Sequence, residues 1–183
     1  MAGFAENVDL ALKNGLEVSG SISMPFGSPW EGLIPIDDVE EIVEAYIGVG
    51  IKEISLSDAA GVATPKQVYD MCCSMQKKYP HVKWWLHFHN TRGMAMANIL
   101  AAMEAGITNF DTALGGTGGC PFVPGAAGNI SSEDVVHMMD EMGIATGIDL
   151  LKLIELSRNL LALLGHAGDS YIQKAGRSKD LYK

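Results

Sequence analysis

The chain is poor in basic residues, in cysteine and in long apolar runs. Its 183 residues include 13 basic and 22 acidic side chains, a net charge of −9, which argues against the Lys/Arg-rich face that nucleic-acid binding needs. No run of about 18 apolar residues is present, so the sequence predicts no membrane span and no membrane partner, and its start does not resemble a signal peptide. The three cysteines, Cys72, Cys73 and Cys120, cannot pair evenly, which favours a reducing, cytoplasmic location.

Short apolar segments alternate with amphipathic segments four times along a chain that is long enough to bury one core. The apolar segments near 17–24, 51–57, 82–88 and 107–114 are predicted strands, and amphipathic helices are predicted between them. Because parallel strands need helical crossovers, this alternation predicts a parallel α/β sheet. No linker composition interrupts the chain, so we expect residues 1–183 to form a single domain.

Helix start signals accompany two of the predicted helices. Asp37 and Glu40 have the spacing of a capping box. Thr64, Pro65 and Gln67 combine a cap, a first-turn proline and a reciprocal capping partner. The sequence therefore predicts helices that begin at Asp37 and just after Thr64.

The two ends of the chain depart from the alternation. Residues 4–14 resemble the last turns of a helix with no strand before it. After a Gly/Pro-rich loop at 115–129, the chain continues as helices that begin at Ser131 or Ser132 and that span 148–164. Four βα units are half of the eight that close a barrel, and half a barrel would leave strand edges and an inner face uncovered. We therefore expect a homo-oligomer, or completion by another chain.

The strongest local signal is the pair His87 and His89 at the end of the third predicted strand. Side chains two residues apart on a strand share a face, about 6.6 Å apart, so both imidazoles can converge on one metal ion. In the alternative, one histidine faces the core and the other faces solvent. Active sites of α/β proteins gather at the C-terminal ends of parallel strands, which favours the metal.

Three further residues have two interpretations each. Asp58, at the end of the second strand, can act as an acid or base or can cap the turn before Gly61. Cys120 follows a glycine-rich loop that can hinge, so its thiol is either an acid/base or nucleophile candidate or a loop residue without a role. Asn129 can cap the next helix or offer its amide oxygen to a metal ion.

Taken in order, these motifs resemble the hydroxymethylglutaryl-CoA lyase family of metal-dependent TIM-barrel lyases. The resemblance covers nearly the whole chain and is carried by residues 53–58 and 87–93. Its most specific part is the segment 118–122, Gly-Gly-Cys-Pro-Phe, followed by 125–129, Gly-Ala-Ala-Gly-Asn. It implies the second half of a TIM (β/α)8 barrel, strands five to eight, followed by C-terminal helices, as a partial domain of the pyruvate carboxyltransferase/HMG-CoA lyase type.

The resemblance also implies an activity and a set of site residues. The activity is retro-Claisen cleavage of 3-hydroxy-3-methylglutaryl-CoA to acetyl-CoA and acetoacetate with Mg²⁺ or Mn²⁺. The implied metal ligands are His87, His89 and Asn129; the implied catalytic residues are Cys120, Asp58 and His87; and the implied substrate-binding residues are Asp58, Ser23, Gly118 and Gly119.

The sequence departs from the family pattern at several positions. The family's first strand carries Arg-Asp-Gly, whereas none of the three arginines here is followed by aspartate. Two histidines and an asparagine alone form a neutral ligand set that should hold Mg²⁺ weakly. Asn90 and the segment Ser23–Met24–Pro25 also replace residues that are usual in relatives. These departures leave two alternatives. One is a related enzyme, a Claisen-type synthase or an aldolase, that acts on another 3-hydroxy acyl substrate. The other is a non-catalytic half-barrel that self-associates.

Overall fold

The computed structural model describes residues 2–119, 123 and 125–182. Its centre is a four-stranded sheet in the order β1-β2-β3-β4, made of β1 (Ser19–Ser23), β2 (Glu53–Asp58), β3 (Lys83–Phe88) and β4 (Phe110–Asp111). Each neighbouring pair of strands is parallel, so all four C-terminal ends lie along one rim. The predicted parallel α/β sheet is confirmed.

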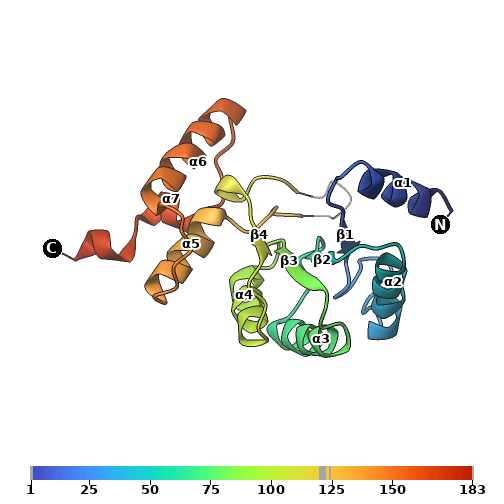
Figure 1. Ribbon diagram of the computed structural model, residues 1–183. Helices are drawn as coiled ribbons and strands as arrows, with labels where there is room; N and C mark the ends of the chain where they lie inside the picture. The colour runs from blue at the N-terminus through green and yellow to red at the C-terminus, as the bar shows by residue number, and fades with distance from the viewer. Residues whose placement is uncertain (1, 120–122, 124, 183) are drawn as a thin grey trace.

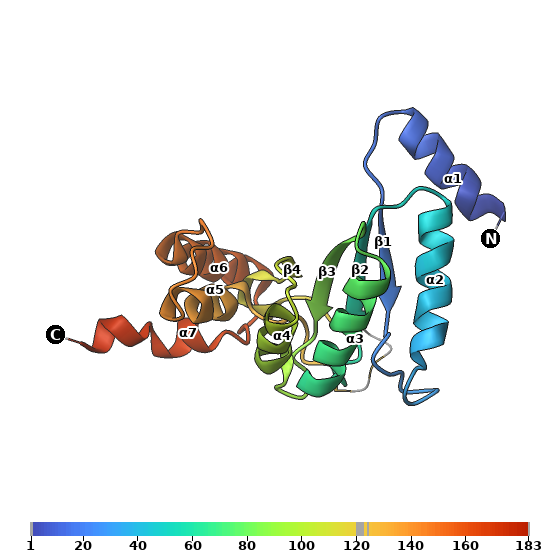
Figure 2. The same cartoon turned by 60° about the horizontal axis from the view of Figure 1, so that its bottom comes forward.

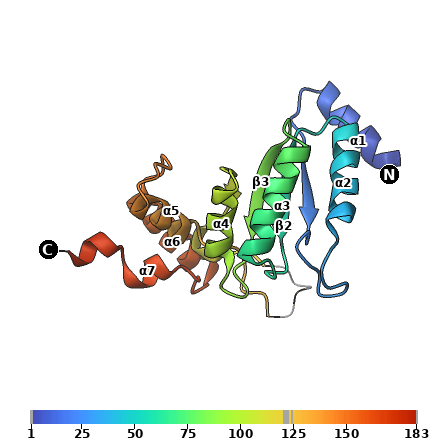
Figure 3. The same cartoon turned by 90° about the horizontal axis from the view of Figure 1, so that it is seen from below.

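Three helices cover one face of this sheet: α2 (Ile36–Gly48), α3 (Pro65–Lys78) and α4 (Ala95–Glu104) (Figure 1). The remaining helices lie beyond the sheet edges, with α1 (Ala2–Lys13) past β1 and with α5 (Ser132–Glu141), α6 (Leu150–Leu164) and α7 (Tyr171–Ala175) past β4 (Figure 2). Two 3₁₀ helices, η1 (Leu114–Gly116) and η2 (Ser178–Leu181), complete the described elements. The sheet thus lies between α1 at one edge and α5, α6 and α7 at the other, and the chain ends are far apart (Figure 3). No described helix is long and apolar enough to cross a membrane.

The two faces of the sheet differ in polarity because side chains alternate along each strand. The face toward α2, α3 and α4 carries the buried side chains Ile22, Ile54, Leu56, Leu86 and Phe88. The opposite face carries mainly polar and partly exposed side chains, namely Ser19, Ser21, Ser23, Glu53, Ser55, Ser57, Lys83, Trp85 and His87. The hydrophobic core therefore lies on one side of the sheet, and polar groups line the other.

Helix caps confirm one start signal and correct another. At α3, the Thr64 side chain accepts a hydrogen bond from the Gln67 amide, and the Gln67 side chain accepts one from the Thr64 amide, as predicted. The capping box predicted at Asp37 is wrong, because α2 already begins at Ile36, after Pro35, without a side-chain cap. Asp37 lies instead in the first turn, where a negative charge favours the helix dipole.

The fourth strand is shorter than the predicted segment 107–114. The Ile107 amide is bonded to the Ala102 carbonyl at the end of α4, at 2.9 Å. Beyond β4, the Ala113 amide donates to the Ile130 carbonyl at 3.1 Å rather than to β3. Both ends of the predicted strand thus bond to other segments, and only Phe110–Asp111 pairs with β3.

Candidate functional site

The strand register brings four polar residues into one row at the C-terminal rim. Ser23 pairs with Ser57, Ser57 with His87, and His87 with Asp111. Neighbouring strands lie about 4.8 Å apart, so the row extends across the whole polar face. Directly paired residues in a sheet point to the same side, which places these four side chains together.

Asp111 is a site residue that the sequence analysis missed. Its carboxylate oxygen lies 3.9 Å from His87 Nδ1 and accepts a hydrogen bond from Ser55 Oγ at 3.5 Å. The rule that drew attention to Asp58, a polar residue at the end of a predicted strand, could also have found it. The strand prediction ran on to residue 114, however, and placed Asp111 inside the strand.

His87 in β3 and His89 just after its end lie side by side, as predicted. Their ring centroids are 5.2 Å apart, and His89 is buried whereas His87 is partly exposed. Burial, together with the neighbouring His87, lowers the pKa of His89. His89 is therefore neutral at neutral pH, which is the form of histidine that binds metal ions.

The long loop returns Asn129 to the side of His89. Residues 89 and 129 form an antiparallel bridge, supported by hydrogen bonds from the Asn90 amide to the Gly128 carbonyl and from the Ile130 amide to the Phe88 carbonyl. Asn129 Nδ2 donates to the Thr117 carbonyl at 2.8 Å. The alternative that Asn129 caps the next helix is wrong, because Ser131 caps α5.

Two buried atoms at this point have no hydrogen-bond partner among the described residues: His89 Nδ1 and Asn129 Oδ1. An unpaired buried polar atom is costly, and a missing ion is one explanation for it. A neutral imidazole and an amide oxygen suit a divalent cation. The described residues contain no group of three or more His, Cys, Asp or Glu side chains that could hold a metal, so these residues fit a cation as part of a ligand set.

Glycines let the loop approach Asn129 closely. The Asn129 amide donates to the Gly118 carbonyl at 3.1 Å, and a Cβ on Gly128 would lie 2.3 Å from that carbonyl oxygen. Gly118 has φ +89°, and a Cβ there would lie 2.8 Å from Asn129 Nδ2. Gly118 therefore packs directly on a candidate ligand; the substrate-binding roles of Gly118 and Gly119 stay predictions. Cys120 lies outside the described residues.

The structure corrects the position expected for Asp58. Its register partner on β3 is Phe88, on the helix-covered face, rather than His87. The carboxylate is fully buried and accepts hydrogen bonds from the amides of Val62 and Ala63 at 3.0 and 2.9 Å. Burial raises the pKa of Asp58 although these amides oppose the shift. The turn-capping alternative is the one the structure shows, and the position of Asp58 supports no acid–base or substrate role.

Replacing Asp58 is therefore expected to lower stability. Asp58→Ala removes the acceptor of two backbone amides and should reduce the free energy of unfolding by about 2–4 kcal/mol, whereas Asp58→Asn keeps an oxygen acceptor and should lose less. Urea denaturation measures both. Asp70→Ala is the matched control, because Asp70 is exposed and forms a surface ion pair with Lys66, so its effect should stay below about 1 kcal/mol. Equal losses for Asp58→Ala and Asp70→Ala would contradict the capping role.

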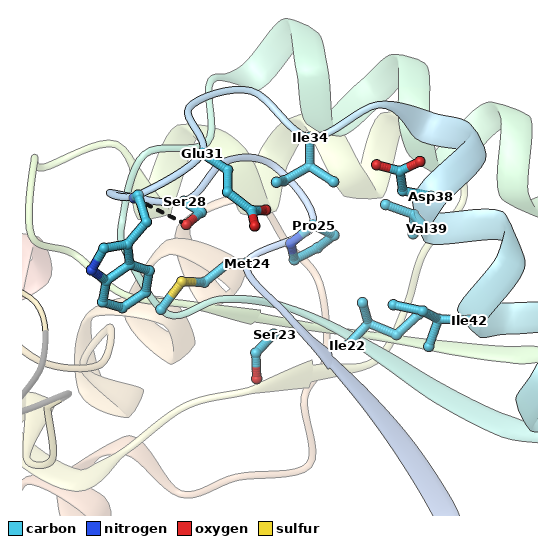
Figure 4. Close-up of a pocket in the computed structure, with 11 residues that line it drawn as sticks. Ile22, Ser23, Met24, Pro25, Ser28, Glu31, Ile34, Asp38, Val39 and Ile42 are labelled. Carbon is cyan, nitrogen blue, oxygen red and sulfur yellow. Dashed lines mark hydrogen bonds between the residues drawn. The ribbon is translucent and has the colours of Figure 1, made fainter. Parts of the chain in front are cut away.

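Ser23 also borders a pocket of about 510 Å³ beside the open edge of β1 (Figure 4). The pocket lies between the segment after β1 and α2, and it is lined by Ile22, Ser23, Met24, Pro25, Ser28, Trp30, Glu31, Ile34, Asp38, Val39 and Ile42. Met24 has φ +62° and donates its amide to the Ser57 carbonyl at 2.7 Å. Backbone strain of this kind clusters at functional sites, and here it lies next to the polar row.

Comparison with known proteins agrees with this geometry. A family model described as HMGL-like matches residues 4–160. The chain is 44% identical over 164 residues to the (R)-citramalyl-CoA lyase of Chloroflexus aurantiacus, covering 90% of this chain and 52% of that protein. It is 41% identical over 148 residues to a hydroxymethylglutaryl-CoA lyase of Bacillus subtilis, covering 81% of this chain and 50% of that protein. The chain thus spans about half the length of these relatives.

Solved structures give the same result. An HMG-CoA lyase from Acinetobacter baumannii, in complex with coenzyme A and 3-methylmalate, matches with a TM-score of 0.92 and 48% identity, covering 100% of this chain and 59% of that chain. The HMG-CoA lyase of Bacillus subtilis matches with a TM-score of 0.88 and 37% identity, covering 93% of this chain and 57% of that chain. The fold, the paired histidines and these matches together confirm the resemblance, and the chain belongs to the HMGL-like family.

Proposed function

We propose that this chain supplies the second half, strands five to eight, of a (β/α)8 barrel that cleaves a carbon–carbon bond in a 3-hydroxy-3-methyl acyl-CoA with a divalent cation. The favoured substrate is 3-hydroxy-3-methylglutaryl-CoA, with acetyl-CoA and acetoacetate as products. Relatives named for this activity or for citramalyl-CoA cleavage support the reaction class. The helices α2, α3 and α4 all lie on one face of the sheet (Figure 1), which supports the opposite face as the inner face of a barrel, because the helices of a (β/α)8 barrel lie outside its strands.

The observation that carries the proposal is the pair of unpartnered buried atoms on neighbouring residues. His89 Nδ1 and Asn129 Oδ1 have no hydrogen-bond partner in the described structure, and the His87 ring lies beside His89. Two unpaired buried ligand atoms on neighbouring residues at the C-terminal rim of a parallel sheet support a bound cation at this point. These three residues would hold Mg²⁺ or Mn²⁺.

The reaction is a retro-Claisen cleavage. The tertiary hydroxyl gives its proton to a base, for which His87 is the candidate by resemblance. The C3–O bond then becomes the carbonyl of acetoacetate as the bond between C2 and C3 breaks, and the electron pair of that bond passes to the thioester as the enolate of acetyl-CoA, which takes up a proton at C2. A bound divalent cation would supply Lewis-acid stabilisation of the substrate oxygens. Ser23 and Ser57, in the same row as His87, would orient the substrate. By resemblance alone, Cys120 is the proposed proton donor to the enolate.

Assembly and location belong to the same proposal. A half-barrel needs a partner for the open edge of β1 and for the polar face, so we propose a homo-oligomer or a complex with a chain that carries the first half. That half would bring an Arg-Asp pair. The two described cysteines, Cys72 and Cys73, are free, which supports a reducing compartment such as the cytoplasm.

Substrate choice is tested by assembling this chain with a separately produced first half that carries Arg-Asp-Gly. The assembled protein is incubated with Mn²⁺ and either hydroxymethylglutaryl-CoA or citramalyl-CoA, and products are identified by mass spectrometry. We expect acetyl-CoA from both thioesters and faster release from hydroxymethylglutaryl-CoA. Faster cleavage of citramalyl-CoA would make citramalyl-CoA the preferred substrate. An assembled barrel that cleaves neither thioester would contradict the proposal.

A further inference from the structure

The chain beyond α6 lies outside the residues that the family model matches, which end at 160. This C-terminal segment, defined here as residues 165–175, comprises a loop and α7. It returns to the glycine-rich loop that follows β4 and contacts the start of that loop (Figure 1). It is held by buried and part-buried hydrogen bonds, and Ile172 packs against a small apolar cluster of α5 and α6, which sets it apart from a loosely packed tail.

Gly115, at the start of the loop, is held through both of its backbone groups. Its amide donates to both carboxylate oxygens of Glu133, each at 3.0 Å, and its carbonyl accepts from the Asp169 amide at 2.8 Å. Gly115 has φ +61°, and a Cβ there would lie 2.8 Å from a methyl carbon of Leu161. One acceptor from α5 and one donor from the C-terminal segment therefore determine where the loop begins.

Glu133 is itself oriented by the C-terminal segment. Its side chain is fully buried, and the Gln173 side-chain amide donates to it at 2.6 Å. The side-chain Nε2 of Gln173 also donates to the Ser157 hydroxyl, so both N–H groups of the side-chain amide are used. Ser131 Oγ supplies a further hydrogen bond to Glu133 at 2.8 Å. Burial raises the pKa of Glu133, but the hydrogen bonds from Ser157, Gly115 and Ser131 outweigh it and leave the carboxyl ionised.

Asp134 fixes the direction from which Gln173 reaches Glu133. Its carboxylate accepts hydrogen bonds from Ser170 Oγ at 2.9 Å and from the amides of Tyr171 and Ile172 at 3.0 and 2.9 Å. The Ser170 hydroxyl in turn caps α7 by accepting a hydrogen bond from the backbone amide of Gln173 at 3.1 Å. The first turn of α7 is therefore tied to α5 at several points, and Gln173 has little freedom.

The far end of this chain of contacts is Asn129. The Thr117 amide bonds to the Leu114 carbonyl at 3.1 Å, and the Thr117 carbonyl accepts from Asn129 Nδ2 at 2.8 Å. A primary amide that donates through nitrogen has its oxygen pointing away, so the position of Thr117 sets where Asn129 Oδ1 points. That oxygen is the one without a partner.

We propose that Gln173 is a positioning residue: through Glu133 and Gly115 it holds the glycine-rich loop in the place that orients the Asn129 amide beside His89. The ligand role of Asn129 rests on the proposed function, whereas the positioning itself rests only on the contacts above. Gln173 itself lies beyond the residues that the family model matches, whereas Glu133 and Gly115 lie within them.

Hydrogen exchange tests the positioning in the full 183-residue chain. Gln173→Met keeps the length of the side chain but removes its donors, and exchange is followed by mass spectrometry in peptides spanning 113–119. We expect exchange there to accelerate about tenfold or more, since a hydrogen bond to a charged group is lost. Gln76→Met is the matched control, because Gln76 also donates its amide to two carbonyls, Ala105 and Cys72, but on the α3–α4 side. It should leave 113–119 unchanged.

A double variant shows whether Gln173 acts through Glu133. If it does, Glu133→Ala should accelerate exchange at 113–119, and adding Gln173→Met should have little further effect because the two changes break one network. Unchanged exchange in Gln173→Met, or equal acceleration in Gln76→Met, would overturn the inference and leave the segment a packing element. Gln173→Ala provides a second single variant should Gln173→Met fail to fold.

Mn²⁺ titration separates this inference from the proposed function. Loss of a residue that orients a ligand typically weakens metal affinity about 10–100-fold, so we expect a loss in that range for Gln173→Met and none for Gln76→Met. If the wild-type chain binds no Mn²⁺, the proposed metal site fails while the exchange measurement still decides the positioning. If Mn²⁺ binds wild type and Gln173→Met equally while exchange accelerates, the link to Asn129 is overturned.

Discussion

The isolated 183-residue chain is expected to release no measurable acetoacetate from hydroxymethylglutaryl-CoA. The electron pair of the broken bond needs a cationic or hydrogen-bonding group where the enolate forms, and loss of one such group commonly costs about 10²–10³ in rate. None of the three arginines reaches the histidine pair in the described structure. Arg92 donates to the carbonyls of Ala60 and Gly61, Arg177 pairs with Asp180, and Arg158 is exposed on α6.

Weak cation binding is a second reason to expect no activity from the chain alone. The implied ligands are two neutral imidazoles and a neutral amide, whereas Mg²⁺ prefers carboxylate oxygens. The nearby carboxylate is Asp111, 3.9 Å from His87 Nδ1, where it can orient that ring. Two missing contributions should multiply, which takes the rate below detection.

The measurement compares the chain alone with the chain mixed with a first half that carries Arg-Asp-Gly. Acetoacetate should appear only in the mixture, and a first half with Arg-Asp changed to Ala-Ala should fail to restore it. Within the restored protein, Cys120→Ser should lose activity by orders of magnitude without unfolding the chain. If the chain alone gives a robust rate and Cys120→Ser abolishes it, groups other than the Arg-Asp pair complete the site.

Removing His89 is expected to abolish the binding of Mn²⁺, the second large effect. His89 is buried, and it is adjacent to both other implied ligands. Loss of a residue that merely orients a ligand already costs about 10–100-fold in affinity, so loss of a ligand from a set of three should cost at least about 100-fold. Calorimetric titration of wild type and His89→Ala measures the difference. His81→Ala is the control, because His81 is an exposed histidine before β3.

A change at Asn129 should have the opposite effect on Mn²⁺ affinity in the same titration. Asn129→Asp places a charged oxygen where the neutral amide oxygen lacks a partner, and hard cations bind carboxylates better. This variant loses the hydrogen bond to the Thr117 carbonyl, but the added charge on the ligand atom should outweigh that loss, so it should bind Mn²⁺ more tightly than wild type. Indistinguishable titrations for wild type, His89→Ala and Asn129→Asp would mean that the histidine pair is structural.

Local sequence patterns were sufficient for the elements of the fold and for the histidine pair. Strand alternation alone places His87 and His89 on one side, and the capping signals at Thr64 and Ser131 depend only on residues within one turn. These predictions hold because each concerns atoms within a few residues of one another. Where a local signal had a competitor, as at Asp37 after Pro35, the local prediction failed.

The remaining site residues depend on contacts between distant segments, which no local pattern encodes. Asn129 is a candidate ligand because the loop returns to pair with β3 and Ser131 takes over the cap. Asp111 joins the row because the β3–β4 register places it beside His87. Asp58 lies outside the row because it is in register with Phe88 and its carboxylate accepts from the amides of Val62 and Ala63. For Asn129 and Asp58, the hydrogen-bonding needs of the folded backbone decided between the two roles that the sequence allowed, and for Asp111 the strand register alone was decisive.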